Sequence, residues 1–268
     1  MMMSPNLVLG VALGGALLVA SSRSPGPASG DVAERVRQYT NAMSGAYAKV
    51  RDYTTIFHKR ERVGGELQPA ERIELKFRKP LAVYLAWTRE AHAGQELIYV
   101  AGWNGGKLRA HKGSFPDLTV NLAPRSTLAM KGNRHPVTEV GFGHTIAIIA
   151  ADVRRSEAHP EDGTRYLDLG ESTVYGAASR CVEQQVPAAA AASYYAARAL
   201  ICFDVRTYMP TRVTTWDGEG RLVEDYGYER TRLDAEMKQL REAAVTSDRT
   251  VDQAKSDLAH RRSRLRAL

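Results

Sequence analysis

The sequence predicts an α+β fold: a curved antiparallel sheet of about ten strands, forming an unclosed β-barrel, with helices on or in its concave face and a further helix at the C-terminus. Three observations predict this fold. A helical period near the start changes to a period of two at Val50. Short alternating segments then follow one another through glycine and proline turns, in two groups separated by one helical stretch. A sheet of this size twists and curls, which leaves a concave face for the helices to cover.

The first 29 residues differ from the rest and predict export. They contain no acidic residue, and positions 7–20 form an unbroken run of apolar residues and glycine. This run is shorter than the roughly 20 residues that a membrane-spanning helix needs, and it matches the apolar core of a secretory signal. We therefore expect residues 1–29 to be a cleaved signal peptide with a linker, and the protein to be periplasmic or otherwise exported. The alternative is an uncleaved N-terminal anchor.

A half-barrel domain is expected over residues 30–234, and it begins with a helix at 31–49. Apolar residues recur there at steps of three and four, and Asp31 with Glu34 resembles a capping box. Alternating residues and turn signals then predict strands at 52–63, 72–79, 83–87, 96–100, 107–112 and 118–122.

A helical insertion is expected at 137–155, with Thr138 as its cap, although Gly141 and Gly143 weaken its first turn. After it, the same alternation predicts strands at 165–169, 180–186, 197–206, 211–216 and 221–228. The segment 217–220, which reads Asp-Gly-Glu-Gly, is a strong turn signal between the last two strands.

The two cysteines provide a test of this register. Facing residues of an antiparallel hairpin have a constant sum of residue numbers, and the sum for Cys181 and Cys202 centres the hairpin inside the expected turn at 188–193. The same sum pairs Val182 with Ile201 on the other face. We therefore expect a cross-strand disulfide between Cys181 and Cys202, worth roughly 3 kcal/mol. The alternative is two buried thiols.

Several groups of residues carry a resemblance to a known family: Tyr53, Phe57, Lys59, Glu61 and Pro69, the segments 75–87, 96–102 and 132–141, residues 204–212, and Tyr226 with Tyr228. Together they resemble an exported bacterial family, the domain of unknown function 1571. The layout of that family is similar to that of the periplasmic lipoprotein carrier and the lipoprotein-localisation superfamily. The resemblance implies an unclosed barrel whose concave face, covered by helices, holds acyl chains.

Catalytic and metal-binding motifs are absent from the sequence. The seven histidines form neither an HExxH nor an HxH pattern, and there is no GxSxG, P-loop or Rossmann glycine pattern. His135, beside Pro136, is interpreted as a turn or helix-entry residue. A carboxylate pair could come from Glu61, Glu74, Glu96 and Glu139, but charged residues on strands usually form a solvated face. We therefore expect no enzymatic activity, no catalytic residue, no metal site and no cofactor.

An apolar ligand cavity is expected on the concave face, because a curved sheet with an aromatic and aliphatic inner face is typical of ligand sites. Its mixture of tyrosine, tryptophan and aliphatic side chains suits an amphiphile with a polar head. The candidate lining residues are Phe57, Leu75, Phe77, Tyr84, Trp87, Tyr99, Phe142 and Ile146. The alternative is that the same side chains form a core packed against the helices.

Residues 235–268 are expected to form a basic helical tail. The net charge of +7 is concentrated in residues 249–268, which argues against a nucleic-acid-binding surface on the domain itself. The cluster Arg261, Arg262, Arg264 and Arg266 could contact an anionic membrane peripherally. The alternative is that it complements the dipole of its own helix.

These interpretations predict an exported envelope protein that binds lipid or an acylated protein in a half-barrel cavity without catalysis. The alternative is a sensor or scaffold module of the envelope that binds a protein partner on the same fold. Co-purified lipid would favour the first and a dry, fully packed interior the second.

Overall fold

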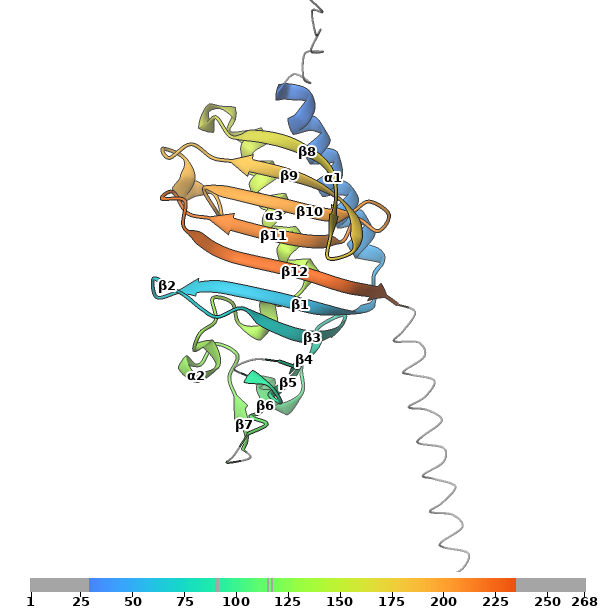
Figure 1. Ribbon diagram of the computed structural model, residues 1–268, viewed down its shortest axis with the longest axis vertical. Coiled ribbons are helices and arrows are strands. Elements are labelled where there is room, and N and C mark those ends of the chain that lie inside the picture. The colour runs from blue at the N-terminus through green and yellow to red at the C-terminus, as the bar shows by residue number, and fades with distance from the viewer. Residues whose placement is uncertain (1–28, 90–91, 115, 117, 235–268) are drawn as a thin grey trace, which may run out of the picture.

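The computed structural model describes residues 29–89, 92–114, 116 and 118–234 (Figure 1). The predicted signal peptide lies outside the described residues except for Ser29, and the predicted basic tail at 235–268 lies outside them entirely. Within the described ranges, no helix combines the length and the apolar composition needed to cross a membrane.

One antiparallel sheet of 12 strands confirms the predicted curved, open sheet (Figure 1). Its first group comprises β1 (Asp52–Val63), β2 (Glu66–Leu67), β3 (Glu71–Arg78), β4 (Ala82–Trp87), β5 (Glu96–Val100), β6 (Leu108–His111) and β7 (Thr119–Leu122). The second group comprises β8 (Arg165–Val174), β9 (Ala177–Gln185), β10 (Arg198–Asp204), β11 (Pro210–Trp216) and β12 (Leu222–Leu233). The strand order is β7-β6-β5-β4-β3-β1-β12-β11-β10-β9-β8, with β2 paired to β1. The sheet is therefore open between β7 and β8, and the two groups meet where β1 pairs with β12.

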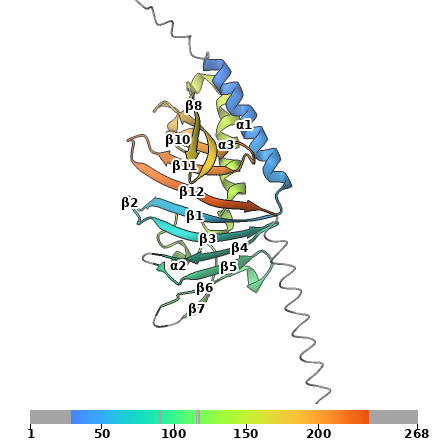
Figure 2. The same cartoon turned by 45° about the vertical axis from the view of Figure 1, so that its right-hand side comes forward.

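Two long helices, α1 (Ser29–Lys49) and α3 (Phe142–Ala158), lie on the same side of strands β8–β12 (Figure 2). They pack against each other, and α1 also packs against β8. The buried residues of α3 recur at helical spacing and face the sheet. The remaining helical segments are short: α2 (Thr127–Met130), η2 (Asn104–Gly106), η3 (Val137–Glu139), η4 (Pro160–Asp162) and η5 (Ala191–Ser193).

The predicted helix at 137–155 was wrong in its first part. Residues Val137–Glu139 form a separate 3-10 turn, and α3 begins at Phe142, so Thr138 does not cap it. Gly141 separates the two with a φ of 107°, a conformation that L side chains rarely adopt. A Cβ at Gly141 would stand 2.2 Å from the Tyr53 hydroxyl. That hydroxyl accepts a hydrogen bond of 3.0 Å from the backbone N–H of Phe142, which positions the start of α3 over the sheet.

An aromatic stack fills the centre of the domain beneath α3. Tyr53 lies between Phe77 and Phe142, with ring centroids 5.0 and 4.3 Å away, and it is fully buried. Phe142 also contacts Tyr228 on β12, at 4.7 Å between centroids. The junction of the two strand groups is therefore packed core.

The disulfide prediction is confirmed. Cys181 and Cys202 face each other on β9 and β10 with Cα atoms 4.1 Å apart, and they are bonded. The same register pairs Val182 with Ile201, as the constant sum requires.

The structure also extends some predicted strands. The strand predicted at 165–169 continues as β8 to Val174, and the one predicted at 221–228 continues as β12 to Leu233. Gly170 has a φ of 78° and lies at a β-bulge opposite β9, so this glycine bends the strand instead of terminating it.

Candidate functional site

A cavity of about 420 Å³ lies on the inner face of the first strand group. Strands β1, β3–β7 and β12 contribute lining residues, and so does the segment from Leu128 to Thr145, which includes η3 and the first turn of α3. Its lining is mainly aliphatic and aromatic: Phe57, Ile73, Leu85, Trp87, Leu97, Leu108, Val120 and Leu122. The volume falls within the range of small-molecule sites, about 300–1,000 Å³.

Three apolar side chains at this cavity are strongly exposed. Leu128 is 61% exposed, Leu118 is 51% exposed and Val120 is 39% exposed. Leu118 and Val120 belong to the segment that forms β7 at the open edge of the sheet. Clustered exposed apolar groups beside a cavity are typical of a site that admits an apolar ligand.

The predicted lining residues are divided among three places. Phe57 and Trp87 line the cavity. Five others are buried in the core and are not among the lining residues: Leu75, Phe77, Tyr99, Phe142 and Ile146.

The eighth, Tyr84, lies on the opposite face of the sheet, because it alternates with the buried residues Val83 and Leu85. Its hydroxyl donates a hydrogen bond of 2.8 Å to Glu96. The inner face is therefore packed core near the Tyr53 stack and an open cavity near Trp87.

Charged side chains adjoin the cavity at the junction of β1 and β12, where Glu61 belongs to the cavity lining and Glu224 does not. Glu61 on β1 and Glu224 on β12 are only 3% and 2% exposed. The backbone N–H of Arg134 donates to Glu61 at 2.9 Å, and its guanidinium Nε donates to Glu224 at 2.7 Å. The Tyr226 hydroxyl also donates to Glu61. These bonds attach the connection before η3 to both strands, and they compensate the cost of burying the two carboxylates.

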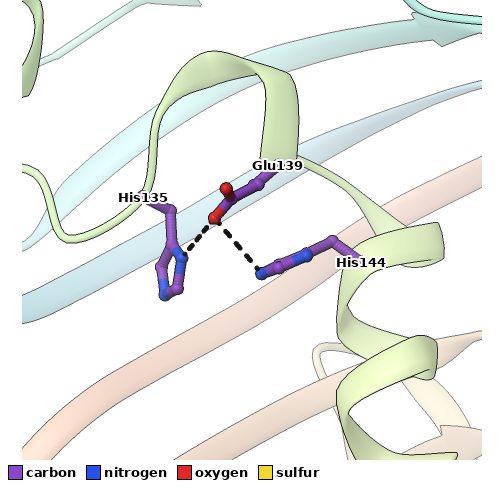
Figure 3. Close-up of side chains that lie close together, drawn as sticks. All are labelled: His135, Glu139 and His144. Atoms are coloured by element: carbon purple, nitrogen blue, oxygen red, sulfur yellow. Dashed lines mark hydrogen bonds and ion pairs between the residues drawn. The ribbon is translucent and has the colours of Figure 1, made fainter. Parts of the chain in front are cut away.

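His135, Glu139 and His144, which also belong to the cavity lining, converge on one another (Figure 3). His135 lies just before η3, and Glu139 is the last residue of η3. His144 lies in the first turn of α3, so the turn at Gly141 brings the three residues together. His135 Nδ1 is 3.0 Å from Glu139 Oε2, and His144 Nε2 is 3.6 Å from the same oxygen. On its other side, His135 Nε2 is 3.0 Å from Glu224 and 2.8 Å from the Tyr195 hydroxyl.

The electrostatics of these groups differ. Burial disfavours protonation of His135, but its hydrogen bonds to Glu224 and Glu139 outweigh burial and raise its pKa. Burial and the neighbouring His135 both lower the pKa of His144, so this imidazole is neutral near pH 7. Burial opposes ionisation of Glu224, yet hydrogen bonds from His135 and Tyr195 keep its pKa below the ordinary value. Glu224 is therefore a carboxylate that fixes the His135 ring.

Sequence reasoning missed this cluster. The sequence predicts only a turn or helix-entry residue at His135, and His135 does immediately precede Pro136, which stands at the N-cap position of η3. A carboxylate pair was expected to come, if at all, from Glu61, Glu74, Glu96 and Glu139, but the structure places Glu61 opposite Glu224 and Glu139 beside the histidines. The sequence does hold one signal of the cluster: several polar and charged residues lie close together in the segment 132–141. A simple turn between two elements does not need so many of them.

Comparison with solved structures gives distant likenesses. Lipoprotein LppX of Mycobacterium tuberculosis is 12% identical over 74% of this chain and 95% of its own, with a TM-score of 0.44. A putative outer membrane lipoprotein-sorting protein domain from Vibrio parahaemolyticus is 10% identical over 76% and 94%, with a TM-score of 0.35. A DUF1329 family protein from Desulfovibrio piger is 12% identical over 76% and 94%, with a TM-score of 0.33.

Among curated proteins, none matches the sequence. The family described as "Protein of unknown function (DUF1571)" matches residues 50–244, which include all the strands that the structure describes, the cavity and the His135 cluster. This confirms the resemblance carried by the sequence motifs, and the chain belongs to the DUF1571 family.

Proposed function

We propose that the protein binds an acyl chain, of a free lipid or of an acylated protein, in the cavity beside Trp87, and that it does so without catalysis. The observation that carries the proposal is the cavity itself: about 420 Å³, with an aliphatic and aromatic wall and exposed leucines beside it. Each buried methylene contributes about 0.8 kcal/mol, so a chain of ten methylenes gains about 8 kcal/mol before the costs of association.

The polar surroundings support an amphiphile with an anionic head. Lys112 and Lys131 are exposed and belong to the cavity lining. A carboxylate or phosphate at the end of an acyl chain could reach these ammonium groups while the chain lies against Leu97 and Leu108. Because the lysines are solvated, they contribute to orientation more than to affinity.

An exported location is part of the proposal. The buried Cys181–Cys202 disulfide supports it, because disulfides persist in oxidising compartments such as the periplasm. The apolar run at 7–20 supports it independently.

Native mass spectrometry of the protein purified from an envelope fraction tests the proposal. We expect a bound mass, and denaturation of the same sample should release either a lipid or a lipidated peptide, which distinguishes the two sources. If the protein carries no bound mass and takes up neither a fatty acid nor a phospholipid on incubation, the proposal is wrong.

A further inference from the structure

We propose that His135, Glu139 and His144 bind a divalent transition-metal cation of the Zn²⁺ type. Two imidazoles and one carboxylate are a donor set that such cations prefer, and three protein ligands with one open position are common in zinc sites. One ligand atom from each residue lies within 4.8 Å of the other two. The inference does not depend on the proposed acyl chain, since the metal alone can be assayed.

The distances fit a coordination sphere. Bonds of about 2.0–2.1 Å to a tetrahedral centre place neighbouring ligand atoms about 3.3 Å apart. Glu139 Oε2 is 3.0 Å from His135 Nδ1 and 3.6 Å from His144 Nε2, on either side of that value. Figure 3 shows both rings directing a nitrogen toward the same carboxylate oxygen.

The surroundings of His135 resemble the outer shell of a metal site. Ligating histidines usually donate their second ring N–H to a carboxylate, which fixes the tautomer and the ring. His135 Nε2 lies 3.0 Å from the buried carboxylate of Glu224, which Arg134 and Tyr195 also contact at 2.7 Å each. If Nε2 carries the proton, the lone pair of Nδ1 points at the carboxylate oxygen of Glu139, so two acceptors face each other. A cation bound between these two atoms would stabilise this arrangement.

His144 provides an independent observation. Its Nε2 is shielded from solvent, and no described residue gives it a hydrogen-bond partner. The nearest carboxylate oxygen, on Glu139, is 3.6 Å away, which is beyond hydrogen-bonding distance. Buried polar atoms are nearly always satisfied, so an unpartnered imidazole nitrogen beside a carboxylate points to a ligand that completes the group.

The site also has access to the cavity, because all three residues belong to its lining. A bound cation would therefore have room for a water molecule at its open position. Arg125 pairs with Glu139 from outside, and Glu139 remains available through its other oxygen, Oε2.

Zn²⁺ titration of the untagged, metal-stripped protein, in competition with a chromogenic chelator, tests the inference. We expect one high-affinity site, weakened at least 100-fold in His144→Ala and in His135→Ala. His159→Ala is the matched control, because the His159 side chain is 45% exposed and pairs with Glu161 instead of with the cluster, and this variant should retain the wild-type affinity. Zn²⁺ should also raise the melting temperature of the wild type and of His159→Ala, but not that of His144→Ala.

The inference is overturned if Zn²⁺ binds His144→Ala as tightly as it binds His159→Ala, or if the wild type shows no saturable binding and no change in melting temperature. Circular dichroism of each apo variant verifies that it is folded before the comparison. His144→Gln, which keeps a side chain of similar reach without the imidazole, replaces His144→Ala if the latter does not fold. None of these outcomes bears on uptake of fatty acid by the cavity.

Discussion

Glu61 on β1 lies directly opposite Glu224 on β12, and both carboxylates are buried on the inner face of the sheet. The next inward pairs along the same strands are Lys59 with Tyr226 and then Phe57 with Tyr228. The junction between the first and last strands thus changes from charged to aromatic over two steps. Of these residues, the cavity lining includes the charged Glu61 and Lys59 and the aromatic Phe57, Tyr226 and Tyr228.

Loss of the disulfide should destabilise the protein. Cys181 and Cys202 are separated by 21 residues, for which the chain-entropy model gives roughly 3 kcal/mol. The variant with both cysteines replaced by alanine should therefore melt about 6–12 °C lower than the wild type. If calorimetry shows an unchanged melting temperature, the disulfide does not stabilise the protein by restricting its unfolded chain.

Gly141→Ala should be more destabilising than Gly220→Ala. Both glycines have positive φ, at 107° and 76°, but a Cβ at Gly220 meets nothing within 4 Å. Backbone strain alone should cost Gly220→Ala about 1–2 kcal/mol. Gly141→Ala should cost about 2 kcal/mol more, because its methyl group displaces the Tyr53 hydroxyl.

Urea denaturation measures both free energies of unfolding. Tyr53→Phe removes the hydroxyl, so Gly141→Ala should cost less in a Tyr53→Phe background than in the wild type. Equal effects of the two glycine substitutions would contradict the role assigned to the Gly141 turn.

The ion pair between Asp168 and Arg180 should make the stability of the protein depend on pH. Burial tends to raise the pKa of Asp168, but hydrogen bonds from Arg180 and from the backbone of Gly170 outweigh it and lower that pKa. A carboxyl group whose pKa is lower in the folded state contributes stability above its unfolded pKa of about 3.9, and this contribution disappears as pH falls through the folded value. Asp168→Asn should therefore lower the melting temperature at pH 7, and the difference should shrink below about pH 4. A difference that stays constant from pH 7 to pH 3 is incompatible with this origin.

Filling the cavity should weaken binding of an acyl chain. Ala110 on β6 belongs to the lining, whereas Ala86 on β4 faces the other side of the sheet, because it alternates with Leu85 and Trp87. Ala110→Trp should weaken binding of a fluorescent fatty acid at least tenfold, because the indole occupies the volume of the chain. Ala86→Trp adds the same group outside the cavity and should bind like the wild type. Equal affinity in the two variants would place the ligand elsewhere.

Local patterns were sufficient to predict most of the fold. Alternation and the Gly64–Gly65 turn set the bounds of β1, and the sum of the cysteine numbers set the β9–β10 register. Glycines were harder to interpret, because the same residue type bends β8 at Gly170 and separates η3 from α3 at Gly141. From the sequence alone, a glycine at a β-bulge cannot be distinguished from a glycine at the end of a strand or helix, because both positions use a positive φ.

The site was less predictable than the fold, for two physical reasons. Tyr84 was included for its aromatic ring, although the alternation that places Trp87 inside places Tyr84 outside. The polar cluster depends on the pairing of β1 with β12, which lie at opposite ends of the domain sequence. His135 and His144 meet only because the chain reverses at Gly141 over that junction, and no short motif encodes such a contact.

Quenching of Trp87 by a brominated fatty acid tests the central claim most directly. The chain has three tryptophans, so variants that keep only Trp87 or only Trp216 isolate each signal. Trp87 lines the cavity, while Trp216 on β11 stacks with Arg198, 3.9 Å from its ring centre, and is not part of the lining. If the acyl chain occupies the cavity, the brominated fatty acid will quench Trp87 saturably and leave Trp216 unchanged. Equal quenching of both tryptophans, or no saturable quenching of Trp87, would contradict the account.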